Sequence, residues 1–193
     1  MKKRDRQIEA VYDNYDSHLK SDKTTVSPFV VSSIKPNHPQ SYAAQQYVSS
    51  EYPFGNTSID CEVRNGVPFN YSFSYLSDAV DSKVLVRLDT GDGTHRNRAP
   101  GIPLRLSQVP TPHIHKYRSD GYSVAYPIDG VDYSSEASTK FDYQQGFDYF
   151  CSGLNIHCVE KTVPQFRYAP DGILVFPMTD NDPNEGADFD TTF

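Results

Sequence analysis

The sequence has 193 residues and a formal net charge of −7, from 18 Lys and Arg against 25 Asp and Glu. Its apolar fraction of 37% is low, but 14 Tyr and 11 Phe partly compensate because each aromatic side chain buries a large area. The apolar runs are too short to cross a bilayer, and no apolar stretch follows the basic first residues. We therefore expect one domain, with neither a transmembrane helix nor a cleavable secretory signal.

The cysteines Cys61, Cys151 and Cys158 are odd in number and widely spaced. Without a CxxC pair, they indicate neither a disulfide framework nor a thiolate zinc site. We therefore expect a reducing, cytoplasmic setting, with no membrane partner and no disulfide-linked partner.

The charges are unevenly distributed along the chain. Residues 178–193 contain five acidic residues and no Lys or Arg, which predicts a disordered acidic tail of charge −5. Residues 83–118 contain seven basic and two acidic residues, which gives +5. The acidic total therefore does not exclude a polyanionic partner, because local fields steer binding. Pairing of these arginines with acids elsewhere in the fold is the structural alternative.

The N-terminal part is expected to contain little regular structure. Residues 1–20 begin as a short helix, because Ile8, Val11, Tyr12 and Tyr15 recur at helical spacing. Residues 21–60 are rich in Ser, Pro, Asn and Tyr, which favours loops with short extended pieces, such as residues 29–32. We treat residues 1–60 as one loop-rich N-terminal region.

Several strands are predicted between residues 67 and 128. Segment 67–76 alternates aromatic or apolar residues with small polar ones, and segment 84–88 is rich in β-formers. Residues 90–94 form a glycine-rich turn. Segments 112–118 and 122–128 are joined by Ser-Asp-Gly, which suits a hairpin. The buried face of the first strand is expected to carry Val67, Phe69, Tyr71, Phe73 and Tyr75.

A helix follows, because Phe147, Phe150, Cys151 and Leu154 share one helical face. Ser138 or Thr139 is expected to cap its start and Gly153 its end. Residues 173–176 then form a last short strand. The pattern predicts an α+β fold, with an antiparallel sheet and one main helix packed on it over residues 61–177, followed by the tail 178–193.

Histidines gather inside the basic segment. The alternation of strand 112–118 puts His113, His115 and Tyr117 on one face and Ile114, Lys116 and Arg118 on the other. His95 lies on the preceding loop, and Arg87 and Asp89 lie on strand 84–88 or at its end. If the two strands are neighbours, these groups meet. A structural role for each single histidine is the alternative.

Three chemistries suit this cluster. Three imidazoles with Asp89 make a ligand set for a transition metal, similar to that of cupin barrels, although a cupin has a Glu where Arg118 or Asp120 stands here. Alternatively, two imidazoles flanked by cations suit RNA cleavage without metal or cofactor, one as base and one as acid. Third, the cations and tyrosines make a passive RNA-binding face.

These residues also resemble the pattern of an uncharacterised domain family of Gram-positive bacteria and their mobile elements. The resemblance covers about residues 85–165 and depends on short motifs in a fixed order. These motifs are Arg87-x-Asp89, His95-Arg96-Asn97, Pro112-His-Ile-His115-x-Tyr117-Arg118, Ala125-x-Pro127, and Cys151 with Asn155-Ile156. In context and size the chain is also similar to phage-encoded anti-CRISPR proteins against type II-A Cas9, some of which act on the guide RNA.

The resemblance implies an inhibitor whose partners are guide RNA and Cas9, in the host cytoplasm. The leading hypothesis is metal-independent cleavage of that RNA by His113 and His115 with His95 as a third catalytic candidate. The RNA-binding candidates are Arg87, Arg96, Arg98, Lys116, Tyr117 and Arg118. The alternatives are a non-catalytic Cas9-binding inhibitor that uses acidic surface as a nucleic-acid mimic, and a metal-dependent enzyme with a histidine cluster.

Overall fold

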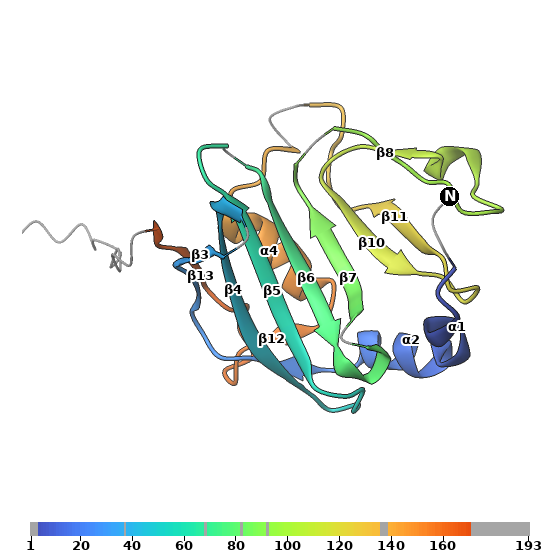
Figure 1. Ribbon diagram of the computed structural model, residues 1–193, viewed down its shortest axis with the longest axis horizontal. Coiled ribbons are helices and arrows are strands. Elements are labelled where there is room, and N and C mark those ends of the chain that lie inside the picture. The colour runs from blue at the N-terminus through green and yellow to red at the C-terminus, as the bar shows by residue number, and fades with distance from the viewer. Residues whose placement is uncertain are drawn as a thin grey trace, which may run out of the picture.

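A computed structural model describes residues 4–36, 38–67, 69–81, 83–91, 93–135 and 139–170 of the chain. The expected strand at 173–176 and the expected acidic tail at 178–193 lie outside these residues. The described part is a mixed α and β structure in which strands predominate, built around a curled sheet (Figure 1).

The described strands are β1 (Lys23–Thr24), β2 (Phe29–Val31), β3 (Ser33–Lys35), β4 (His38–Ser50), β5 (Thr57–Arg64), β6 (Tyr71–Ser77), β7 (Lys83–Asp89), β8 (His95–Arg96), β9 (Gln108–Val109), β10 (His113–Tyr117), β11 (Ser123–Pro127), β12 (Ile156–His157) and β13 (Phe166–Tyr168). The described α-helices are α1 (Arg6–Ala10), α2 (Tyr12–Lys20) and α4 (Tyr143–Ser152). Two short 3-10 helices are η1 (Asp78–Val80) and η2 (Leu104–Leu106).

The main sheet has nine strands in the order β11-β10-β7-β6-β5-β4-β1-β12, with β3 also paired to β4. All of these pairs are antiparallel except β1 with β12. The parallel pair β2–β13 and the antiparallel pair β8–β9 stand apart from this sheet. The expected antiparallel sheet is therefore confirmed in outline, but β12 adds a parallel pair at one edge, and β2 and β13 form a separate parallel pair.

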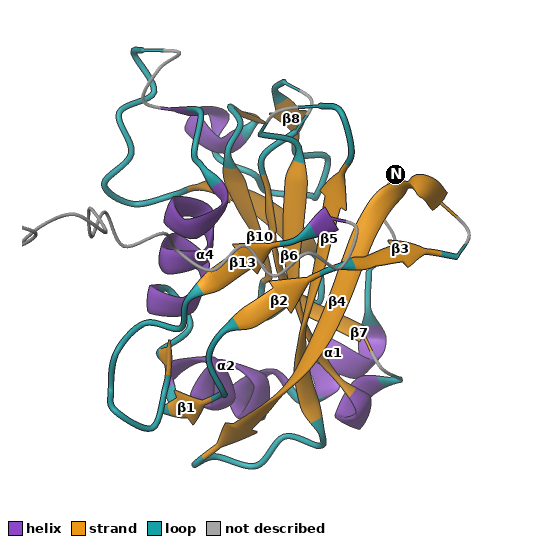
Figure 2. Cartoon of the chain, turned by 90° about the vertical axis from the view of Figure 1, so that its left-hand side faces the viewer, coloured by secondary structure: helices purple, strands orange, loops and turns teal. Residues whose placement is uncertain are grey.

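One face of the sheet is covered by α4, as the side view shows (Figure 2). Asp142 caps the helix, because its carboxylate accepts a hydrogen bond from Gln145 N at 2.7 Å, and Gly153 is the C-cap. The Phe73 ring of β6 lies 5.1 Å from the Phe147 ring and 5.6 Å from the Phe150 ring. The predicted helix and its buried face are confirmed. The helix begins after Asp142 and not at Thr139, and Ser138 lies outside the described residues.

The N-terminal region differs most from expectation. The helix predicted within residues 1–20 is present as α1 and α2, and the extended piece at 29–32 as β2. The loop-rich assignment of residues 21–60 was wrong, because the 13-residue strand β4 runs through it. β5 crosses the expected boundary at residue 60 and pairs with both β4 and β6, so the sheet is continuous there.

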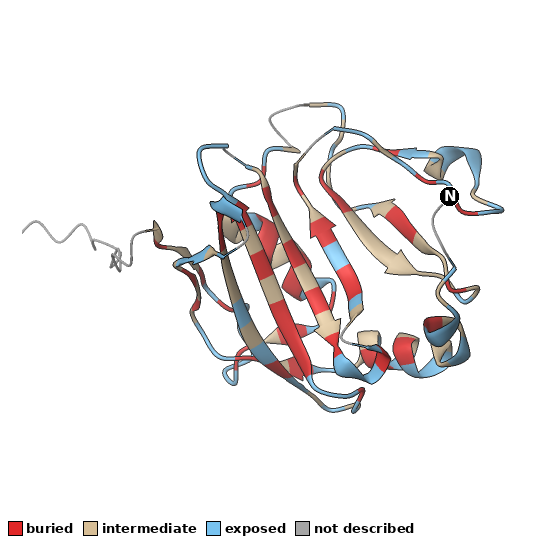
Figure 3. Cartoon of the chain, viewed as in Figure 1, coloured by how far each residue is buried: buried red, intermediate tan, exposed pale blue. Residues whose placement is uncertain are grey.

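The burial pattern shows why the central strands form. β6 alternates strictly between buried and partly exposed residues, with Tyr71, Phe73 and Tyr75 on the buried side (Figure 3). Val67 and Phe69 do not continue this face: they are 43% and 39% exposed, and Phe69 has a φ of 59°. A turn before residue 71 therefore shortens the predicted strand at its start.

A buried lysine joins the helical and strand layers. Lys23 is 1% exposed, and its ammonium donates hydrogen bonds of 2.9 Å to the carbonyls of Leu19, Ser21 and Leu154. Burial lowers the pKa of Lys23 to about 8. This side chain ties the end of α2 to the chain just after α4.

The packing of α4 on β6 depends on the absence of a side chain at Gly146. A Cβ atom at Gly146 would overlap the Tyr71 hydroxyl and lie 2.8 Å from two carbons of its ring. That hydroxyl donates hydrogen bonds to the carbonyls of Phe141 and Asp142. We expect Gly146→Ala to lower the free energy of unfolding by about 1–3 kcal/mol, measured by denaturant titration. Gly153→Ala, at the exposed end of the same helix, is the control, and an equal loss there would contradict this explanation.

Candidate metal centre in an arginine-lined groove

The candidate site forms where β7 and β10 pair. Their antiparallel register places His113 opposite Asp89 and His115 opposite Arg87. All four side chains lie on the sheet face opposite α4, because their neighbours Leu88 and Ile114 point the other way. The condition under which the sequence predicts that these groups meet, that the two strands are neighbours, is thus met in the fold.

His95 completes the cluster from β8, outside the main sheet. Its ring centroid is 5.2 Å from that of His113 and 4.7 Å from that of His115, while those two rings are 5.0 Å apart. Each imidazole offers a nitrogen, and the three nitrogens lie within 4.8 Å of one another. Within the described part of the chain, this is the group of three or more His, Cys, Asp or Glu residues close enough to hold a metal ion.

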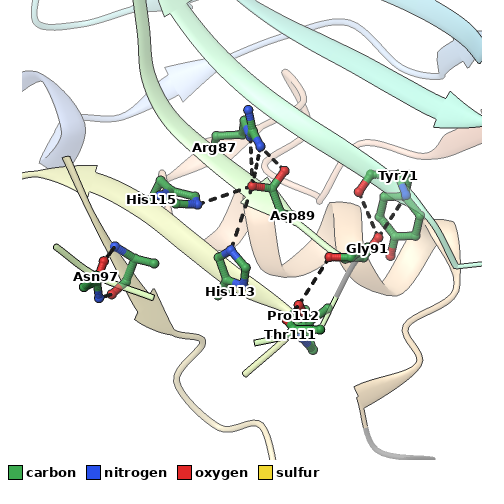
Figure 4. A network of polar contacts seen from close by, with 12 residues as sticks. Tyr71, Arg87, Asp89, Gly91, Asn97, Thr111, Pro112, His113 and His115 are labelled. Carbon is green, nitrogen blue, oxygen red and sulfur yellow. Dashed lines mark hydrogen bonds and ion pairs between the residues drawn. The ribbon is translucent and has the colours of Figure 1, made fainter. Parts of the chain in front are cut away.

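Asp89 connects two of the histidines to Arg87. Its Oδ2 atom is 3.4 Å from Nε2 of His115 and 3.9 Å from Nε2 of His113. Nε of Arg87 donates to both carboxylate oxygens, at 2.7 and 2.9 Å. Figure 4 shows both imidazoles directed at this carboxylate, with Arg87 reaching it from another side. The carboxylate and guanidinium therefore hold each other in place beside the imidazoles.

Charge and burial set the protonation of the site. Burial alone would raise the pKa of Asp89, but the hydrogen bond from His115 and the Arg87 guanidinium outweigh it and hold the pKa at about 2. Burial, and next the neighbouring His115, lower the pKa of His113 to about 4. At neutral pH, Asp89 is therefore ionised and His113 is neutral. A neutral imidazole is the form that binds a metal or accepts a proton.

The burial of His113 favours a ligand role. The residue is 4% exposed and its Nδ1 atom is buried; no hydrogen bond of normal geometry from the described residues reaches that atom, although a weaker interaction with the Pro110 backbone opposes the lowering of the His113 pKa. A buried imidazole nitrogen without a well-formed hydrogen bond remains available as a metal ligand. In a tetrahedral centre with metal–nitrogen distances near 2.0–2.1 Å, the ligand nitrogens lie about 3.3 Å apart, so small side-chain movements would close this cluster on an ion.

Two cavities meet at the cluster. The larger, of about 750 Å³, is bordered by His95 and His113, and the smaller, of about 330 Å³, by His95 and His115. Arg87 and Asp89 also border both. A row of paired residues across four strands contributes to the wall of the larger cavity; it consists of Glu62, Ser72, Asp89 and His113.

The larger cavity is rich in arginine. Its lining includes Arg64, Arg87, Arg96 and Arg98. Arg87 is paired with Asp89, whereas the other three have no carboxylate within ion-pair distance in the described ranges. The structural alternative, that the basic residues of segment 83–118 pair with acids, therefore holds for Lys83, Arg87 and Arg118 but, within those ranges, not for Arg96 and Arg98. Guanidinium groups without acidic partners beside a cavity favour an anionic ligand.

The other predicted RNA-binding residues lie elsewhere. Tyr117 borders the smaller cavity together with His115. Lys116 borders a separate cleft on the α4 side of the sheet. The guanidinium of Arg118 donates to the Pro100 carbonyl at 3.0 Å and pairs with Asp120, so it supports the loop before η2. Of the predicted set, Arg87, Arg96, Arg98 and Tyr117 surround the histidines, and Lys116 and Arg118 do not.

Arg64 was absent from the predicted set. It ends β5, which is separated from β10 in the sheet by β6 and β7. No local pattern distinguishes Arg64 from other exposed arginines, so only the strand order could have identified it.

Asn97 holds His95 in the cluster. Its side-chain amide donates to the Ala125 carbonyl at 2.8 Å and accepts from Ala125 N at 2.9 Å, so it pairs with the edge strand β11 as a backbone would. The same amide donates to the Leu106 carbonyl at 2.7 Å. The segment that carries β8, η2 and β9 is thereby attached to the sheet two residues after His95. The sequence motif His-Arg-Asn contains this residue, but nothing in the pattern predicted its partner.

Within the described residues, no helix is long and apolar enough to span a membrane. All three cysteines are described, and each is buried as a free thiol.

We expect Asn97→Asp to detach the segment that carries β8, η2 and β9 from the sheet, because a carboxylate oxygen would then face the carbonyls of Ala125 and Leu106. The free energy of unfolding should fall by about 2 kcal/mol or more, measured by thermal and denaturant unfolding. The control is Asn14→Asp, since Asn14 is exposed and only accepts a hydrogen bond, from the Tyr52 hydroxyl. Equal stability of the Asn97→Asp variant and the unmodified protein would refute the docking role.

Comparison with protein-family models, with curated proteins and with solved structures found no match to this chain. The functional argument therefore depends on the geometry of the site.

Proposed function

We propose that the chain is a metal-dependent enzyme that cleaves phosphate esters. The observation that supports this most directly is the convergence of His95, His113 and His115 beside a cavity lined by arginines. Imidazole ligands suit zinc and neighbouring transition metals. A metal ion bound there would act as a Lewis acid on a phosphoryl oxygen.

Side chains of the protein bind the substrate and orient the metal ligands. Arg64, Arg96 and Arg98 bind non-bridging oxygens of the substrate, since their guanidinium groups have no acidic partner in the described structure. Asp89, held by Arg87, orients the His115 imidazole, as carboxylates commonly do for histidine ligands. In the reaction, a water oxygen bonds to phosphorus and the bond to the leaving oxygen breaks. The leaving oxygen takes up the proton that the water gives up.

A second candidate is cleavage of RNA by the histidines without a metal. The observation that favours it is the pair of adjacent imidazoles: His113 is neutral at pH 7, and Nε2 of His115 lies 3.4 Å from the ionised Asp89 carboxylate. A neutral imidazole can take the 2′-hydroxyl proton, and a second imidazole can transfer a proton to the leaving oxygen. The resemblance to anti-CRISPR proteins makes the guide RNA of Cas9 the first RNA to test.

Metal binding is the first test of the proposal. We expect one Zn²⁺ per chain, measured by isothermal titration and by elemental analysis after dialysis. His113→Ala and His95→Ala should abolish stoichiometric binding, because each removes one of three ligands. Asp89→Asn should weaken binding about 10–100-fold, as loss of a supporting carboxylate does. His38→Ala is the control, since His38 is exposed at the start of β4. Unchanged binding in both His113→Ala and His95→Ala would disprove the centre.

Cleavage is the second test. A short single-stranded RNA, a Cas9-loaded guide RNA and bis(p-nitrophenyl) phosphate are incubated with the protein, with and without EDTA. The proposal expects cleavage of at least one of them that EDTA stops and Zn²⁺ restores. Cleavage that persists in EDTA and is lost in His113→Ala would select the metal-free candidate. No cleavage of any of the three would reject both.

The arginines give this test a second readout. The Arg96→Gln/Arg98→Gln variant should weaken RNA binding and lower the slope of log K against log salt by about 1.4, since each phosphate contact to a single strand contributes about 0.7. Arg6→Gln, an exposed arginine on α1, is the control.

The rival hypothesis of a nucleic-acid mimic depends on residues 178–193, outside the described structure. If the proposed enzyme function is correct, deleting these residues should leave cleavage unchanged. If the protein is a nucleic-acid mimic, the deletion should weaken Cas9 inhibition.

A further inference from the structure

A second cleft lies on the opposite side of the β10–β11 hairpin from the histidines. It has a volume of about 800 Å³ and lies between that hairpin, the end of α4 and η2. Binding sites for small molecules commonly have volumes of this order. It is bordered by six apolar or aromatic residues, Leu106, Ile114, Tyr126, Pro127, Ile128 and Tyr149.

Strand alternation separates this cleft from the metal centre. Ile114 and Lys116 alternate with His113 and His115 along β10, and Tyr126 of β11 is paired with Ile114. The same strand thus presents imidazoles to the groove and an apolar wall with one ammonium to the cleft. The two sites share no lining residue.

Lys116 is the distinctive group in this cleft. It is half-buried, and in the described ranges its ammonium has no hydrogen-bond acceptor and no carboxylate within ion-pair distance. The carboxylates whose charges reach it are those of Asp129, exposed at the rim, and Asp16 of α2, which pairs with Lys20. Arg105 adds a second, exposed cation at the rim. An ammonium beside an apolar wall, without a partner, is complementary to a single anionic group.

We infer that this cleft binds a small ligand with an apolar body and one carboxylate, such as a medium-chain fatty acid, with the carboxylate on Lys116. The apolar side chains of both strands contact the hydrocarbon part. Lys116 is the half-buried cation of this cleft, whereas Arg105 is exposed, so one negative charge suits it. The arginine-lined groove, which has three guanidinium groups without acidic partners, suits a more highly charged substrate.

The experiment is an NMR titration of the full-length protein with octanoate and, as the uncharged counterpart, with octanol. The expected result is saturable shifts at Ile114, Lys116 and Ile128 on octanoate addition, with His95 and Arg96 unaffected. Lys116→Met keeps the aliphatic stem and removes the charge. It should weaken the binding of octanoate about tenfold or more and leave the binding of octanol unchanged. Lys116→Arg should retain octanoate binding.

Two further variants complete the design. Ser152→Phe places a ring into the cleft from the exposed end of α4 and should abolish binding of both compounds. Lys161→Met removes an exposed charge that is paired with Asp22, and it should change the binding of neither octanoate nor octanol. The inference is overturned if octanoate causes no saturable shift at these residues. It is equally overturned if Lys116→Met binds octanoate as the unmodified protein does, or if the shifts map to the histidine groove. Zn²⁺ binding is measured separately, so failure here does not affect the proposed function.

Discussion

The antiparallel register between β7 and β10 is the constraint on which the functional architecture depends. Pairing His113 with Asp89 and His115 with Arg87 determines which side chains share a face of the sheet. A shift of β10 by one residue would turn its imidazoles toward α4 and move Ile114 to the opposite face of the sheet. The aromatic core therefore enforces the register, because Phe73 and Tyr75 of β6 need apolar neighbours on the helix-covered face.

The register alone does not complete the site, because its third imidazole comes from outside the main sheet. β8 pairs only with β9 in the described structure, and this small unit needs an attachment to hold His95 in place. The Asn97 amide supplies that attachment, with one donor and one acceptor aligned to the edge strand β11. The site is thus built on a rigid sheet and completed by a loop held to it, an arrangement common for functional residues.

The expectations from sequence succeeded where hydrophobic periodicity was strong. β6 and α4 carry clear patterns of period 2 and 3.6, β7 is rich in β-formers, and the β10–β11 hairpin has a typical turn; all four are present. The expectations failed for residues 21–60, where β4 contains Ser, Ala and Gln on its partly exposed positions. Such a strand is stabilised by hydrogen bonds to β3, β5 and β1, so its own composition carries little signal.

For the site, the sequence by itself determined which side chains of residues 112–118 share a face, but not which residues from other segments join them. The alternation of residues 112–118 placed His113 and His115 together and sent Lys116 to the opposite face, because side chains on a strand point alternately to its two sides. Tertiary structure decided that Asp89 and His95 join the imidazoles, that Arg64 borders the same groove, and that Lys116 borders a separate cleft. Contacts between residues distant in sequence depend on strand order and loop docking. These are collective results of packing the whole core, which no local pattern encodes.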